Sequence, residues 1–189
     1  MLAVVLAVLL PLGEPMGAIL ALFPLVFLVY VGAGIVAWYR RPRNQIGSLI
    51  VLAGLSIYLV GLGNGNIAAL QLLGDLAGTL PLMVAIHLLH AYPSGRLHGW
   101  AARTIVIVGY VSVLVLQPLQ VFASRAAADG TADPSAATAV AEAASGIPVA
   151  VGGLVMAGTI LLLVFRLRRA VQVTRRVLVP VYSYGVVAI

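Results

Sequence analysis

The chain has 189 residues, of which 62% are hydrophobic and 8% charged, and its net charge at pH 7 is +6. A soluble domain is roughly half apolar and about a quarter charged, so this composition excludes an ordinary water-soluble fold. The sequence contains no cysteine, which excludes disulfides, thiolate-held iron–sulfur clusters and covalent c-type haem attachment. We therefore expect an integral membrane protein whose partner is the lipid bilayer.

Apolar segments follow one another along the whole chain. Five of them are uncharged and, at about 1.5 Å of helix per residue, long enough for a hydrocarbon layer of about 30 Å. They lie near residues 16–39, 46–63, 76–92, 103–122 and 146–165. Residues 1–13 and 177–189 are apolar but short, which predicts a partial span at each end. The sequence thus predicts an all-α fold: one polytopic transmembrane helical bundle over residues 1–189, with five full spans plus two partial terminal ones.

The basic residues are distributed unevenly over the connections between these spans. Ten of the eleven fall in alternate connections, and only Arg125 lies with the five acidic residues on the other side. Because cytoplasmic loops retain arginine, the Arg-rich connections are expected to face the cytoplasm. This placement between apolar segments also argues against nucleic acid as a partner, since a nucleic-acid reader needs its basic residues on one water-exposed face.

The opposite connections carry polar residues with two open interpretations. Asn64, Asn66, Gln71 and Asp75 are expected to form a loop at the outer interface, and the alternative is a polar pocket that binds a signal or solute. In the longest outer connection, Pro134 after Asp133 predicts the start of a short helix that ends at Gly146. A bend is expected near Pro148.

His87 and His90 are the candidates for metal ligands. Residues three apart share one face of a helix, so these two imidazoles could bind one metal ion together. No third ligand accompanies them in the sequence, so an interfacial or interhelical hydrogen bond is the favoured interpretation. We identify no catalytic residue and no cofactor-binding residue, because the sequence lacks a phosphate loop, a zinc-protease motif and a nucleophile elbow. Several glycines, including Gly32, Gly34, Gly152, Gly153 and Gly158, are expected to allow close packing of membrane helices.

Two Arg-rich turns carry a resemblance to a known family. Residues 40–47 read Arg-Arg-Pro-Arg-Asn-Gln-Ile-Gly and residues 92–97 read Tyr-Pro-Ser-Gly-Arg-Leu. They resemble turns in the membrane domain of multi-pass bacterial sensor histidine kinases, commonly actinobacterial ones, which typically read Arg-Arg-Pro-x-Asn-Pro-Ile-Gly and Phe-Pro-x-Gly-Arg-Leu. This chain departs from that pattern at Gln45 and Tyr92. The residues of these family-motif turns are Arg40, Arg41, Pro42, Arg43, Asn44, Gly47, Pro93, Gly95 and Arg96, with Arg43 at the variable position of the first turn.

The resemblance implies a location and a function. The chain would be the transmembrane sensory or anchoring portion of a two-component sensor histidine kinase in the bacterial cell (inner) membrane. It would relay a membrane or extracytoplasmic signal to a cytoplasmic kinase module that lies beyond Ile189, so we expect the chain to be a fragment of a longer protein. A homodimer and a cytoplasmic response regulator would be its protein partners, and no phosphoacceptor role falls to His87, His90 or His98. The alternatives are a small multi-pass transporter subunit or a membrane scaffold protein.

Overall fold

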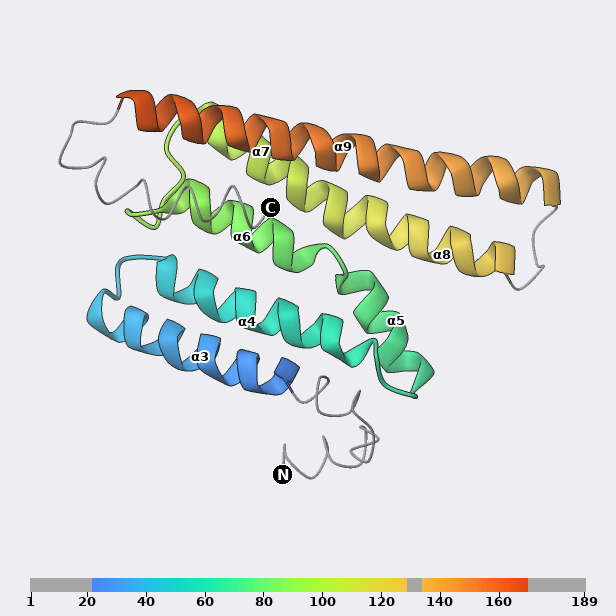
Figure 1. Cartoon of the computed structure of the whole chain (residues 1–189), viewed down its shortest axis with the longest axis horizontal. Coiled ribbons are helices and arrows are strands. Elements are labelled where there is room, and N and C mark those ends of the chain that lie inside the picture. The colour runs from blue at the N-terminus through green and yellow to red at the C-terminus, as the bar shows by residue number, and fades with distance from the viewer. Residues whose placement is uncertain (1–21, 129–133, 170–189) are drawn as a thin grey trace. The chain divides into compact units, whose positions relative to one another are not determined.

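The computed structural model describes residues 22–128 and 134–169 (Figure 1). Every regular element within these two ranges is helical, which confirms the predicted all-α class for them. The elements are α3 (Leu22–Arg40), α4 (Ile46–Leu62), α5 (Ala68–Ala77), α6 (Leu80–Ala91), α7 (Trp100–Val111), the π-helical segment η1 (Ser112–Leu116), α8 (Gln117–Ala128) and α9 (Pro134–Arg169). Asp133 and the two predicted partial spans lie outside the described residues.

Within the described residues, four helical stretches are long and apolar enough to cross a membrane. They are Leu22–Arg40, Ala68–Ala91, Trp100–Ala128 and Gly146–Arg168. Large apolar side chains cover their outer surfaces, and Leu154 and Val149 on α9 are each 74% exposed. Exposing an apolar surface of this kind is favourable in contact with lipid and unfavourable in contact with water. The chain therefore has the character of a helical membrane protein.

The fifth predicted span coincides with α4, which is shorter than the others. Ile46–Leu62 is an apolar helix of 17 residues, and at 1.5 Å per residue it extends about 26 Å. That length is at the lower limit for a hydrocarbon layer of about 30 Å. The count of five full spans stays a prediction, with four helices meeting the length that a span requires.

The described chain divides into two compact units, and the first contains α3, α4 and α5. The hairpin of α3 and α4 packs closely because glycines meet the opposite backbone. A Cβ atom on Gly34 would lie 2.7 Å from the Gly47 carbonyl oxygen, and one on Gly47 would lie 2.7 Å from the Trp38 nitrogen. Phe27 and Tyr58 stack at the same interface with ring centroids 5.1 Å apart. Close packing at Gly34 was predicted from the sequence and is confirmed.

The four polar residues after α4 are divided between a turn and a helix. Asn64 and Asn66 fall in the turn before α5, but Gln71 and Asp75 belong to α5 itself. The loop prediction was therefore wrong for these two residues, since glutamine itself favours a helix and the alanines and leucines around Asp75 outweigh its weaker propensity. The predicted span of residues 76–92 accordingly begins earlier, at Ala68, with a turn at residues 78 and 79.

The second unit contains the C-terminal part of α6 and the long helices that follow. α7, η1 and α8 form one stretch of 29 residues, which is longer at both ends than the predicted span of residues 103–122. Pro118 explains the π-helical segment, because a proline inside a helix removes one hydrogen bond and its ring clashes with the carbonyl four residues earlier. The backbone of Gln117 instead donates to the Ser112 carbonyl, five residues back, which widens the helix just before the ring.

α9 packs against α7 and α8 over much of its length (Figure 1). It begins at Pro134, as predicted, and continues unbroken for 36 residues to Arg169. The predicted helix end at Gly146 was therefore wrong. A glycine inside a helix costs only about 1 kcal/mol, which the long helical sequence on both sides outweighs. Among the described residues, no atom lies within 4 Å of a Cβ placed on Gly152, Gly153 or Gly32, so the expected close packing is not found at these three glycines, while Gly158 contacts Ile105.

Candidate functional site

The first family-like turn connects α3 to α4. Proline disfavours helical geometry in the residue before it, so Pro42 ends α3 at Arg40. The Arg41 nitrogen still donates to the Ala37 carbonyl at 3.1 Å, and the Asn44 nitrogen donates to the Arg41 carbonyl at 2.9 Å. The turn is thus short and fixed by backbone hydrogen bonds.

The second family-like turn follows α6. The Tyr92 nitrogen donates to the Leu88 carbonyl at 2.9 Å, which completes the last helical turn. Gly95 has a φ of +74°, a conformation that side chains with a Cβ rarely adopt. The residue is also buried, so glycine is required at this position for both its backbone angle and its surroundings.

The structure brings these two turns into contact, although 49 residues separate them. The Asn44 side-chain amide donates to the Pro93 carbonyl at 3.1 Å, and its Oδ1 accepts a hydrogen bond from the Ile46 nitrogen at 3.0 Å. A Cβ on Gly95 would overlap Asn44 Oδ1 and would lie 2.6 Å from the Gln45 nitrogen. The two turns therefore form a single feature with Asn44 at its centre, which we call the paired turns.

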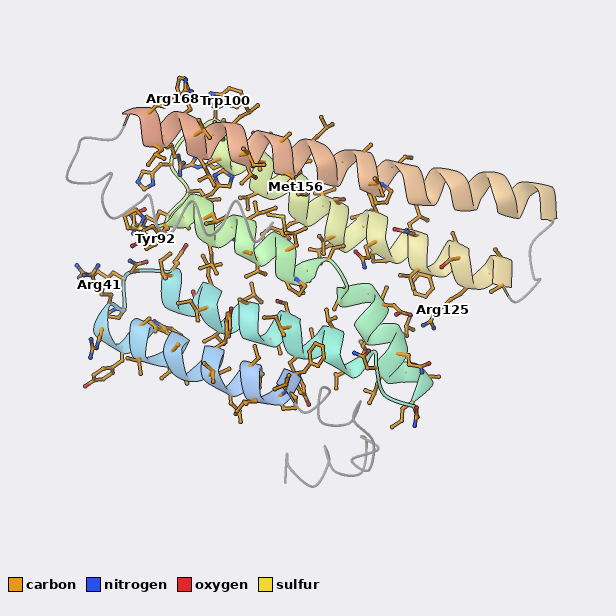
Figure 2. The ribbon with its side chains drawn as sticks, viewed as in Figure 1. Arg41, Tyr92, Trp100, Arg125, Met156 and Arg168 are labelled. Atoms are coloured by element: carbon orange, nitrogen blue, oxygen red, sulfur yellow. The ribbon has the colours of Figure 1, made fainter. Side chains whose placement is uncertain are left out.

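The remaining residues of the family-like motifs divide into buried and exposed groups. Gly47 is buried against α3, where it permits the close approach of the two helices. The exposed group consists of Arg40, Arg41, Pro42, Arg43, Pro93 and Arg96. Figure 2 shows Arg41 projecting outward from the α3–α4 turn. The small and amide residues of the motifs therefore build the structure, and the arginines are presented to the surroundings.

His87 and His90 each make a hydrogen bond to a different helix. His87 Nδ1 lies 3.1 Å from the Tyr110 hydroxyl on α7, with the two rings in an edge-to-face arrangement. His90 is fully buried, and its Nε2 lies 3.3 Å from the Thr159 hydroxyl oxygen on α9. These contacts agree with the interhelical interpretation of the two histidines. No group of three or more His, Cys, Asp or Glu side chains that could hold a metal occurs in residues 22–128 and 134–169.

The Thr159 hydroxyl determines how the His90 ring is protonated. Its single proton is donated to the Val155 carbonyl at 2.7 Å, so towards His90 its oxygen can only accept. Nε2 of a neutral His90 ring must then carry the hydrogen and donate it. Nδ1 is left as a buried acceptor with no hydrogen-bond partner among the described residues, a position that costs stability.

Arg166 also belongs to this region. In the sequence it was only one of the ten basic residues that indicate orientation. Its guanidinium donates to the His90 carbonyl from Nη1 and to the His98 carbonyl from Nη2, each at 2.9 Å. The His90 carbonyl is among the last four of α6, which have no partner within their own helix. Arg166 therefore connects the end of α9 to both ends of the α6–α7 connection. Its position directly after the apolar segment of α9 is a signal that could have suggested such a role.

Comparison with protein families, curated proteins and solved structures gives no match. The class of the protein, a helical membrane protein, accordingly rests on its own four long apolar helices. Any more specific function must be argued from the paired turns and the hydrogen bonds of the second unit.

Proposed function

We propose that this chain is the transmembrane sensory portion of a two-component sensor histidine kinase. It would sit in the bacterial cell membrane with its Arg-rich connections in the cytoplasm and relay a membrane or extracytoplasmic signal to a kinase module beyond Ile189. A kinase of this type acts as a homodimer and passes its phosphoryl group to a response regulator.

The observation that carries this proposal is the contact within the paired turns. The resemblance to sensor kinases rests on two short motifs, and two separate short matches could arise by coincidence. Asn44 and Gly95, one from each motif, touch one another, and the Asn44 amide bonds the Pro93 carbonyl. The two motifs therefore depend on each other physically, which supports treating them as one inherited feature.

The long helix α9 provides a route for a signal in this proposal. Its 36 residues form one continuous helix, which at 1.5 Å per residue extends about 54 Å, more than the thickness of the hydrocarbon layer. Near one end, Arg166 holds the α6–α7 connection. A shift of α9 along or about its axis would therefore change the position of that connection, as helix shifts do in other switching proteins.

The test begins with the coding sequence after Ile189. The full reading frame is expressed, and membrane vesicles that contain its product are incubated with radiolabelled ATP. We expect phosphate on the protein with the stability of phosphohistidine, retained in base and lost in acid. A reading frame that ends within about twenty codons, enough for one last span, would overturn the proposal and leave the transporter subunit or scaffold as the explanation.

A further inference from the structure

Aromatic and basic side chains are concentrated where α3 ends. Tyr39 is 89% exposed and Trp38 is 53% exposed. Arg40, Arg41 and Arg43 follow them directly and are exposed as well. We call these five residues the α3 basic cluster. α3 is apolar up to Tyr39 and charged from Arg40 onward, so the cluster coincides with the point where the helix would leave the hydrocarbon layer.

In residues 22–128 and 146–168, whose side chains the structure describes, no acidic side chain balances this charge. The structure describes one acidic side chain, that of Asp75 on α5. Its neighbour Gly74 packs on Gly63, just past the opposite end of α4 from the cluster. Since α4 extends about 26 Å, Asp75 is too far away to form an ion pair with any of the three arginines. The positive charge is thus available to an anion from outside the described part of the chain.

The backbone that carries the arginines is fixed in place before any ligand binds. Hydrogen bonds join the Arg41 nitrogen to the Ala37 carbonyl and the Asn44 nitrogen to the Arg41 carbonyl. The Asn44 side chain further ties the turn to Pro93. A ligand therefore has only the arginine side chains to order, which lowers the entropic cost of binding.

We propose that the α3 basic cluster binds the headgroup of an anionic phospholipid. Guanidinium groups donate paired hydrogen bonds to phosphate oxygens, and several in succession favour a headgroup with net negative charge over a zwitterionic one. Tryptophan and tyrosine take positions at the boundary between hydrocarbon and headgroups, which is where such a lipid offers its phosphate. The proposal requires the chain to lie in a bilayer and does not depend on the signalling role.

Trp38 allows this binding to be measured at the cluster itself. Trp100 is the second tryptophan and is 81% exposed, so Trp100→Phe leaves Trp38 as the single tryptophan, excited selectively over the tyrosines, with little effect on packing. The variant is reconstituted into equal mixtures of phosphatidylglycerol and phosphatidylcholine, with bromine on the acyl chains of one lipid at a time. Quenching of Trp38 by each brominated lipid gives their relative association constant. We expect at least about a fivefold preference for phosphatidylglycerol, the effect of a single arginine near an anionic surface.

A triple variant and a matched control separate a local site from the total charge. In the Trp100→Phe background, R40Q/R41Q/R43Q should reduce the preference to about onefold. R103Q/R125Q/R168Q changes the net charge equally at other positions and should leave the preference within about twofold of its original value. Circular dichroism establishes that both triple variants retain their helices. Equal quenching by the two lipids before substitution, or the same loss in both triple variants, would overturn the proposal.

Discussion

Gly95→Ala is expected to separate the paired turns. The new Cβ would overlap Asn44 Oδ1 and lie 2.6 Å from the Gln45 nitrogen, so the Asn44 side chain would have to move and give up its bonds with Pro93 and Ile46. Two hydrogen bonds at about 1 kcal/mol each, added to about 1 to 2 kcal/mol for a side chain at positive φ, lower the free energy of unfolding by about 3 to 4 kcal/mol. Equilibrium unfolding in detergent, followed by circular dichroism, measures this change.

Gly99 offers a control that isolates the contact from the backbone strain. It also has a positive φ, of +83°, but no atom of the described residues lies within 4 Å of its Cβ position. Gly99 has a ψ of 155°, in a backbone region that residues with a Cβ avoid more strongly, so Gly99→Ala should cost only this strain, about 1 to 3 kcal/mol.

The decisive comparison repeats both substitutions in an Asn44→Ala background. Removing Asn44 eliminates the side chain that Gly95→Ala displaces, so the cost of Gly95→Ala should fall by about 2 kcal/mol. The cost of Gly99→Ala should not change. If the Gly95 and Asn44 substitutions are additive within about 0.5 kcal/mol, the two turns do not interact as described and the reasoning is wrong.

Three further predictions concern packing and the second unit. Arg166→Gln should destabilise the protein by about 3 kcal/mol through loss of two charge-assisted hydrogen bonds. The exposed Arg168→Gln should change the free energy of unfolding by less than about 0.5 kcal/mol, and equal effects of the two substitutions would contradict the bridging role of Arg166. Thr159→Val should cost about 1 to 3 kcal/mol because it leaves the buried His90 ring without an acceptor, and NMR of the ring nitrogens should show the altered environment. Gly47→Ala should force α3 from α4 and lower the thermal stability, while Gly32→Ala, with open space at its Cβ, should be neutral or stabilise the helix by up to about 1 kcal/mol.

The sequence by itself determined the class of the protein. Uncharged segments near membrane length mark the positions of the helices, because a backbone in lipid must satisfy its hydrogen bonds within each segment. Pro42 and Pro134 likewise marked the end of α3 and the start of α9, since proline acts through its own ring and the residue beside it. Local rules were less reliable at Gly146, because a single glycine cannot stop a helix that favourable residues continue on both sides.

Only the tertiary structure decided which residues meet. Asn44 and Pro93 are 49 residues apart, and His90 and Thr159 are 69 residues apart, so no periodicity or motif in one segment could place them together. The same limit applies to glycine: Gly32 and Gly34 are equivalent in the sequence, yet only Gly34 faces the backbone of α4. The hydrophobic pattern sets the length of each helix. The faces that pack together are decided by the fit between surfaces that are distant in the chain, and that fit exists only in the folded molecule.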